Sequence, residues 1–327
     1  MNNLTIKNQF NSPLAELMDK FINEKQACGY RYQRETQELL RLDRFLCEKQ
    51  LQSIELPREI VDEWTAKKEF EKASNQKLRI IRIRQLALYL QRQGLDAYVP
   101  DNSNTTIKRV EFVPYIFSHQ QIKNIFEAAD NIALDNRSPH RHLIMPEVFR
   151  LLYCCGMRVS EVVNLKSADI DLATGVLTIR ESKFNKDRLI PLSPSMTIRI
   201  RKYASILEGC HSTPFFFPTI TGSAYSKVTI YSLFRQLLWK CRIEHCGRGK
   251  GPRLLDLRHS FAVHRLESWY KQGVDFGVKL PLLSAYMGHK NIISTQWYLQ
   301  LTPEIFPDIV NRLETYVGHI IPGGNKK

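Results

Sequence analysis

The sequence lacks any run of about 18 consecutive apolar residues, the length that a membrane-spanning helix needs. Its first residues, MNNLTIKNQFNSPLAEL, also lack the apolar core of a secretory signal. It contains no internal repeat and no low-complexity segment, and 43% of its residues are hydrophobic, as in ordinary globular proteins. These absences predict a globular, cytoplasmic protein without membrane contact.

Paired cysteine motifs are missing as well. The seven cysteines are an odd number at irregular spacing with no C-x-x-C pair, which is typical of reduced thiols in a cytosolic protein. Zinc could in principle be held by Cys210 with His211, or by Cys241, His245 and Cys246. The unpaired spacing disfavours both sets, so the sequence predicts neither a metal nor a cofactor.

Acidic residues are too few to balance the basic ones. Lys and Arg number 47 against 33 Asp and Glu, a formal net charge of +14. Residues 1–100 hold 17 basic and 14 acidic residues, so most of the excess follows residue 100. An excess of this size indicates a polyanionic partner, most simply nucleic acid, and the alternative is a basic surface without such a partner.

Hydrophobic periodicity divides the chain into two parts. Residues 1–100 show apolar residues at helical spacing with short connections, which predicts a helical domain. Polar residues cluster in 101–117, the predicted linker. Residues 118–327 combine helical patterns with a hairpin pattern, two apolar strands at 176–180 and 188–192 around a polar tip. The expected fold is mainly α with a small β-sheet.

One helical segment of the first part, NQKLRIIRIRQLALYLQRQG, is strongly basic. Its predicted apolar set is Leu78, Ile81, Leu86, Leu88, Tyr89 and Leu90. The cations that crowd its remaining surface are Lys77, Arg79, Arg82, Arg84 and Arg92. Such a helix could lie along a phosphate backbone, and a solvated face without a ligand is the alternative.

Two arginines lie in contexts that suit a bound phosphate. Arg158 follows Gly156, which can end a helix, so Arg158 would lie near the N-terminus of the next helix, where anions bind favourably. Arg258 opens another predicted helix after Pro252. Guanidinium groups present planar pairs of donors that match non-bridging phosphate oxygens. Together the two arginines are candidates for a phosphate clamp.

A tyrosine, a histidine and a lysine would complete a phosphodiester-cleaving site. Tyr298 lies nine residues after His289, and its phenol can attack only if positive charge stabilises the phenolate. Lys183 lies near the hairpin tip, where it could protonate the departing 5′-oxygen, and Lys186 is the competing candidate. This chemistry needs no metal.

With these motifs the chain resembles the tyrosine recombinases, the phage integrase family. GMRVSE at Arg158 resembles the family's G-x-R-x-S-E context, LRHSFA at Arg258 its LRH-x-F-A context, and MGH at His289 its L-G-H context. SKFNKDRLIPL resembles the family's K-x-R-x-x-P-L run and makes Lys183 the favoured lysine, while Tyr298 matches the nucleophile.

The resemblance implies a helical core-binding domain and a mixed α+β catalytic domain that close around double-stranded DNA. It implies that Tyr298 forms a 3′-phosphotyrosine, and that a tetramer exchanges strands through a Holliday junction without a cofactor. The resemblance leaves open whether the role is DNA integration by a mobile element or chromosome-dimer resolution, and whether accessory proteins take part. A C-terminal tail helix would dock on a neighbouring protomer or on its own domain.

Leu255 departs from the family pattern, which has a histidine three residues before the second arginine. Leucine can neither donate a hydrogen bond nor move a proton. Either Leu255 packs in the core and a nearby group such as Arg253, His259 or His264 replaces the histidine, or the site works without that help. Two alternatives therefore stay open: a type IB topoisomerase, and a recombinase-like protein that only binds DNA.

Overall fold

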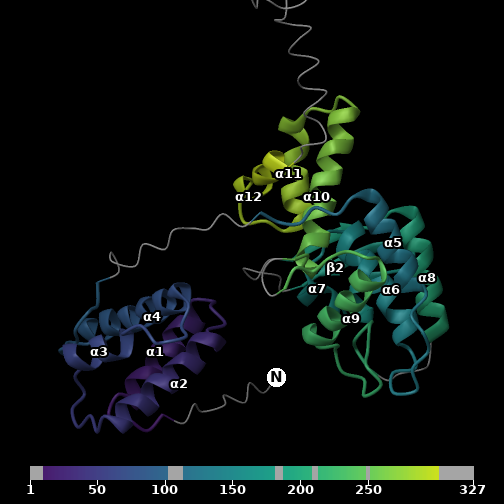
Figure 1. Cartoon of the computed structure of the whole chain (residues 1–327). Coiled ribbons are helices and arrows are strands. Elements are labelled where there is room, and N and C mark those ends of the chain that lie inside the picture. Colours follow the sequence, from purple (N-terminus) through teal and green to yellow (C-terminus); the bar gives the residue numbers. More distant parts are fainter. Residues whose placement is uncertain (1–9, 102–112, 181–186, 208–212, 248–250, 302–327) are drawn as a thin grey trace, which may run out of the picture. The chain divides into compact units, whose positions relative to one another are not determined.

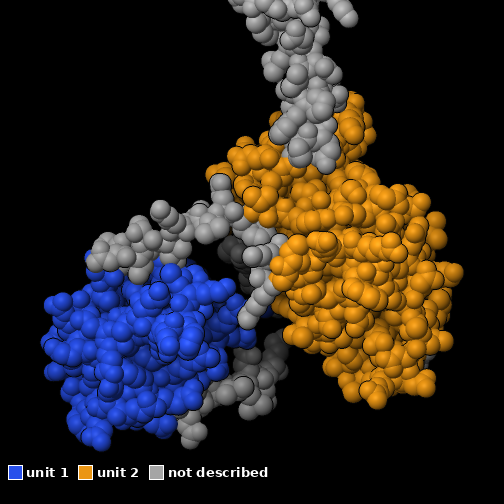
Figure 2. Space-filling view, in the orientation of Figure 1, with its two compact units in different colours: residues 1–111 blue, residues 112–327 orange. Residues whose placement is uncertain are grey.

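The computed structural model of the chain describes residues 10–101, 113–180, 187–207, 213–247 and 251–301. The chain forms two compact units, residues 1–111 and 112–327, which Figure 2 colours blue and orange. The division falls inside the segment that the sequence assigns to a linker, and residues 102–112 of that segment lie outside the described residues. In the part of the chain that the structure describes, no helix is long and apolar enough to cross a membrane.

Within residues 10–101, unit 1 is built from four helices (Figure 1). They are α1 (Ala15–Ala27), α2 (Gln33–Glu48), α3 (Arg58–Thr65) and α4 (Ala73–Arg92). All four contribute to one hydrophobic core, in which Phe21, Leu46 and Leu86 are fully buried. The helical character predicted for the first part of the chain is confirmed.

The buried face of α4 includes Leu86, Tyr89 and Leu90 of the predicted apolar set and differs from that set elsewhere. Ile80 and Ile83 are buried, whereas Leu78 and Leu88 are 48% and 43% exposed. Arg79 lies on the buried face and is only 3% exposed. Packing against the other three helices therefore selects a face of α4 that includes one of its cations.

Unit 2 combines helices with one small antiparallel sheet (Figure 1). Its helices are α5 (His119–Asp130), α6 (Arg141–Cys154), α7 (Val159–Val163), α8 (Pro194–Leu207), α9 (Lys227–Lys240), α10 (Leu254–Lys271), α11 (Phe276–Met287) and α12 (Ile293–Gln296), with 3₁₀ turns η1 (Ser167–Asp169) and η2 (Trp297–Leu301). The sheet has the order β1-β2-β3, with β1 at Ile170–Asp171, β2 at Val176–Ile179 and β3 at Arg188–Pro191. The fold is mainly α with a small β-sheet, as the sequence predicts.

The predicted hairpin is confirmed. Strands β2 and β3 pair antiparallel, with the buried side chains of Leu177 and Ile190 opposite one another. The polar tip, residues 181–186, lies outside the described residues. The sequence did not predict β1 or helix α8.

The packed part of unit 2 begins before α5. Ser118 is the N-cap of α5, and it forms a capping box with Gln121. Phe117, which the sequence places at the end of the linker, is fully buried, and its backbone N–H donates to Ser260 Oγ at 2.9 Å. This bond ties the start of α5 to α10.

Helix α10 passes between two hydrophobic clusters of unit 2. Its first turn contributes Leu254 and Leu257 to the large core around α6. Its middle contributes Phe261 and Leu266 to a smaller cluster with α11 and Tyr298. Arg258 lies between these two groups along the helix, so packing on both sides fixes its position.

Candidate active site

Arg158 lies directly before α7, as predicted. Its backbone N–H and its guanidinium both donate to the Glu161 carboxylate, at 2.8 Å each. Its other terminal nitrogen donates to the Gly288 carbonyl at 2.9 Å. Gly156, two residues earlier, has a φ of +56°, and a Cβ there would lie 2.6 Å from the Phe261 ring. Only glycine lets α10 approach the Arg158 segment so closely.

Arg258 is held by backbone groups from two other segments. Its guanidinium donates to the Gly156 carbonyl and, at 2.6 Å, to the Met287 carbonyl at the end of α11. The residue is 3% exposed. Burial, followed by the charge of the neighbouring Arg158, lowers the pKa of Arg258 to about 10, so the side chain is still a cation at neutral pH.

His289 follows α11, whose C-cap, Gly288, has the left-handed conformation. Its Nδ1 lies 2.7 Å from Thr295 Oγ1, and Thr295 is fully buried. Burial, then the charges of Arg258 and Arg158, lower the pKa of His289 to about 3. The imidazole is therefore neutral at pH 7.

Tyr298 is part of the short turn η2 and is 3% exposed. Its ring lies beside that of His289, with centroids 6.1 Å apart. Burial raises the pKa of the Tyr298 phenol, and the nearby Arg258 and Arg158 charges oppose the rise. The structure thus brings Arg158, Arg258, His289 and Tyr298 together, as the sequence predicts.

His259 makes the direct polar contact with Tyr298. The Tyr298 hydroxyl lies 2.9 Å from His259 Nδ1. The other ring nitrogen, Nε2, lies 4.0 Å from Oδ1 of Asp256, which is fully buried. Burial, followed by the charges of Arg253 and Arg258, lowers the pKa of His259 to about 4. The sequence offers His259 only as one of three possible replacements for the missing histidine, because a motif does not show which ring faces the tyrosine.

Arg188 and Glu161 form a buried ion pair that supports Arg158. Two nitrogens of Arg188 donate to the two Glu161 oxygens at 2.9 and 2.8 Å, and Nε donates to the Tyr286 carbonyl at 2.9 Å. Burial alone would raise the pKa of Glu161, but Arg188 and Arg158 hold it below its usual value. Both residues lie in motifs that the sequence singles out, GMRVSE and KDRLIPL. The motifs do not predict that the two residues pair, because only the folded chain brings them together.

For two other positions that the sequence singles out, Lys183 and Leu255, the outcome differs from that for the four residues around Tyr298. Lys183 and its competitor Lys186 lie outside the described residues, between β2 and β3. Leu255 is 43% exposed, which corrects the idea that it packs in the core. Of the groups considered as replacements for the missing histidine, His259 contacts Tyr298, whereas Arg253 bonds to Asp256 and His264 to Tyr153.

Most cations of the basic helix α4 are engaged within unit 1. Arg79 is buried, pairs with Glu71 and donates to the Trp64 carbonyl, which corrects the prediction that it contacts DNA. Arg82 pairs with Glu38 at 2.6 Å, Arg92 with Glu24 at 3.0 Å, and Arg84 donates to the Pro100 carbonyl at 2.7 Å. A DNA contact by Lys77, Arg82, Arg84 and Arg92 stays a prediction.

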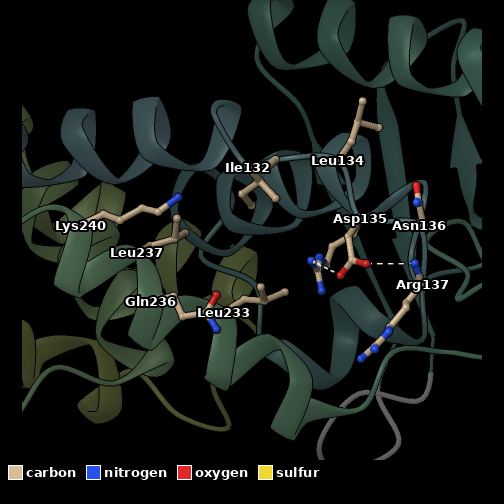
Figure 3. Close-up of a pocket in the computed structure, with 11 residues that line it drawn as sticks. Ile132, Leu134, Asp135, Asn136, Arg137, Leu233, Gln236, Leu237 and Lys240 are labelled. Carbon is tan, nitrogen blue, oxygen red and sulfur yellow. Dashed lines mark hydrogen bonds and ion pairs between the residues drawn. The ribbon is translucent and has the colours of Figure 1, made fainter.

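A separate pocket of about 490 Å³ lies between α9 and the α5–α6 connection (Figure 3). Its lining includes Leu233, Lys240 and Asp135, and Asp135 bonds to the Arg137 backbone N–H and pairs with Arg141. None of the predicted site residues lines this pocket. The pocket therefore does not belong to the arrangement around Tyr298.

Comparisons with known proteins converge on one family. The pattern of the phage integrase family matches residues 116–304. A putative integrase/recombinase of Sinorhizobium fredii, y4rB, is 28% identical over 308 residues, which cover 93% of this chain and 98% of y4rB. The tyrosine recombinase XerA of Pyrococcus horikoshii is 28% identical over 239 residues, which cover 72% of this chain and 74% of XerA.

Solved structures show the same likeness of fold. XerH site-specific recombinase bound to a palindromic difH substrate has a TM-score of 0.58 at 19% identity, covering 86% of this chain and 78% of that one. A lambda integrase dimer bound to a COC′ core site has a TM-score of 0.56 at 17% identity, covering 85% of this chain and 96% of that one. The likeness covers most of the chain.

Proposed function

The chain belongs to the phage integrase family of tyrosine recombinases, and we propose that it cleaves and rejoins double-stranded DNA through a covalent link to Tyr298. Site-specific recombination is the activity of this family. The observation that carries the assignment to Tyr298 is its place in the structure, where its hydroxyl meets His259 and lies beside Arg258, Arg158 and His289.

The first step is attack of the Tyr298 oxygen on a DNA phosphorus. The bond from phosphorus to the 5′-oxygen breaks, so a 3′-phosphotyrosine forms and a 5′-hydroxyl leaves. The 5′-hydroxyl of a partner strand then attacks the phosphotyrosine and releases Tyr298. Each step exchanges one ester for another, so the chain needs no external energy source.

The two arginines bind the phosphate and stabilise the charge that develops on it. Both guanidinium groups are fixed by backbone carbonyls, and that of Arg158 also by Glu161, so little reorganisation is needed when the phosphate enters. The neutral His289 is available as a further hydrogen-bond partner beside them. By the motif that it shares with the family, Lys183 protonates the leaving 5′-oxygen.

His259 positions Tyr298 and accepts its proton. A neutral imidazole carries one N–H, and the carboxylate of Asp256 at 4.0 Å from Nε2 favours the proton on that nitrogen. Nδ1 is then the acceptor for the Tyr298 hydroxyl at 2.9 Å. His259 lies one helical turn after Leu255, so it supplies a proton acceptor where the family's usual histidine is missing.

Double-stranded DNA is the proposed partner. The solved structures that share the fold include complexes with DNA sites, and the net charge of +14 favours binding of a polyanion. Strand exchange between two sites requires four active tyrosines, so we propose a tetramer on DNA, in the cytoplasm, serving the integration of a mobile element. Accessory proteins stay an open part of the proposal.

The alternatives are less well supported. A type IB topoisomerase would also use Tyr298, but the family match and both relatives are recombinases or integrases. A protein that only binds DNA has no use for a buried tyrosine bonded to a histidine beside two fixed arginines.

The test is covalent capture. Nicked duplexes from the DNA that flanks the encoding gene should yield a protein–DNA adduct on denaturing gels. Tyr298→Phe removes one oxygen, so it should bind the same duplexes and give no adduct. Tyr231→Phe, on α9, is the matched control and should react normally. An adduct formed by Tyr298→Phe would refute the assignment of the nucleophile.

A further inference from the structure

Helix α10 carries a second group of polar side chains beyond Arg258 and His259. His264 and Glu267 lie one turn apart on this helix, and His119 is the first residue of α5. One donor atom from each of the three lies within 4.8 Å of the donor atoms of the other two. The His119 and His264 rings are stacked, with centroids 3.9 Å apart and planes inclined by 29°.

We propose that His119, His264 and Glu267 bind one zinc ion. Two imidazoles and one carboxylate are a ligand set that Zn²⁺ accepts, with water in the fourth position of a tetrahedron. Zinc bonds of about 2.0–2.1 Å place neighbouring ligand atoms roughly 3.3 Å apart. The present separations of up to 4.8 Å exceed this value by about 1.5 Å or less. Because a metal lies in the plane of each imidazole that binds it, the exposed His119 ring must also rotate out of its stack with His264.

Tyr153 would orient one of the ligands. Its hydroxyl lies 2.7 Å from His264 Nδ1, so a metal on the other ring nitrogen, Nε2, would leave this contact intact. Metal-bound histidines usually have their second ring nitrogen held in this way, which fixes the tautomer and the ring plane. Burial raises the pKa of Tyr153 to about 12, so this partner stays a neutral hydroxyl.

The backbone already holds the two helices in place for this site. The Phe117 N–H bonds to Ser260 Oγ, and the capping box at Ser118 fixes the first turn of α5, where His119 lies. Glu267 is 5% exposed, and a divalent cation beside it would stabilise its buried carboxylate. A bound ion would thus fasten the start of α5 to α10, the helix that carries Arg258 and His259.

The site can be tested without any DNA. The full chain is stripped with chelator under reducing conditions and titrated with Zn²⁺ by calorimetry and thermal melting. One ion should bind, and at about a hundred times Kd the melting temperature of unit 2 should rise by roughly 5–10 °C.

Two variants show which residues bind the zinc ion. His119→Gln changes an exposed side chain, so it should fold normally and lose the zinc response. His245→Gln is the matched control, and it also removes a histidine from the alternative Cys241, His245 and Cys246 set. Co²⁺ adds a spectroscopic test, since nitrogen and oxygen ligands give visible bands without the intense near-ultraviolet charge transfer that thiolates give. No zinc response in the wild-type chain, an equal response in His119→Gln, or a thiolate band would each overturn the proposal.

Discussion

Replacing Arg188 by Met should destabilise unit 2 strongly, although sequence motifs assign no chemistry to Arg188. Its side chain and that of Glu161 are 9% and 5% exposed. Arg188→Met removes two hydrogen bonds to the Glu161 carboxylate and one to the Tyr286 carbonyl. Removing one partner of a buried ion pair typically costs about 3–5 kcal/mol, because the other charge stays buried.

Arg158 moderates this cost, since it still donates to Glu161 twice. The loss should therefore lie at the lower end, about 3 kcal/mol. For a unit of this size, each kcal/mol lowers the melting temperature by roughly 2–4 °C, so unit 2 should melt roughly 6–12 °C earlier. The assay is denaturant unfolding followed by tryptophan fluorescence, with thermal melting alongside. Trp239, Trp269 and Trp297 lie in unit 2 and Trp64 in unit 1, so the measurements are made in a Trp64→Phe background, in which only unit 2 contributes to the fluorescence.

Arg201→Met on α8 is the control, because Arg201 is an exposed arginine that donates to the Leu172 and Ala173 carbonyls. The double variant Arg188→Met/Glu161→Gln removes the buried charge together with its partner. Its loss should be smaller than the sum of the two single losses by about 1–3 kcal/mol. If Arg188→Met costs no more than Arg201→Met, or if the two single losses add, the ion pair does not support unit 2 as described.

Three further predictions address the reaction and its surroundings. Arg158→Ala and Arg258→Ala should each lower cleavage on the order of 10²-fold or more while DNA binding persists, and near-normal single-turnover cleavage by either would remove it from the phosphate site. Unit 2 should lose stability as the pH falls from about 6.5 toward 4, because unfolded histidine takes up a proton at 6.5 whereas His259 resists until about 4. His259 contributes about 1–2 kcal/mol to this loss between pH 7 and pH 5, and His289, whose pKa is about 3, contributes a similar amount. His259→Gln should therefore reduce the pH dependence by about half in urea unfolding at the two pH values. His259→Gln should also slow cleavage about 10²-fold with a changed pH–rate profile, whereas the exposed Leu255→His should fold normally and change the rate by less than about tenfold. If Leu255→His cleaves faster and His259→Gln cleaves at the normal rate, proton transfer belongs to position 255 and not to His259.

Local patterns predicted the elements of the fold better than the faces on which they pack. The hairpin could be predicted because Leu177 and Ile190 belong to short apolar runs on both sides of a polar tip. The face of α4 could not, since Ile80, Ile83, Leu86 and Leu90 are as good an apolar stripe as the predicted one. The choice between them depends on α1 and α3, and it brings Arg79 to Glu71.

The site residues could be predicted from motifs, but their partners could not. Arg158 and Arg258 stand in recognisable contexts, whereas the groups that fix them are backbone carbonyls of Gly156, Met287 and Gly288. Every residue has a backbone carbonyl, so the sequence does not show which carbonyls will accept these hydrogen bonds. His259 was visible in LRHSFA, but its contact with Tyr298 depends on how η2 folds back against α10.

If Tyr298 is the nucleophile, as we propose, the charges around it would confine cleavage to bound DNA. Without a phosphate, burial and the nearby arginines keep His259 weakly basic, and burial keeps the Tyr298 phenol protonated. A phosphate between Arg158 and Arg258 adds negative charge close to the imidazole, which offsets their repulsion and raises the pKa of His259. The proton acceptor therefore gains basicity when the substrate arrives, and the phenol loses its proton as the bond to phosphorus forms. A surface arginine pair would be screened by solvent and could not act in this way, which gives a physical reason for the burial of Arg258 and Tyr298 at 3% exposure each.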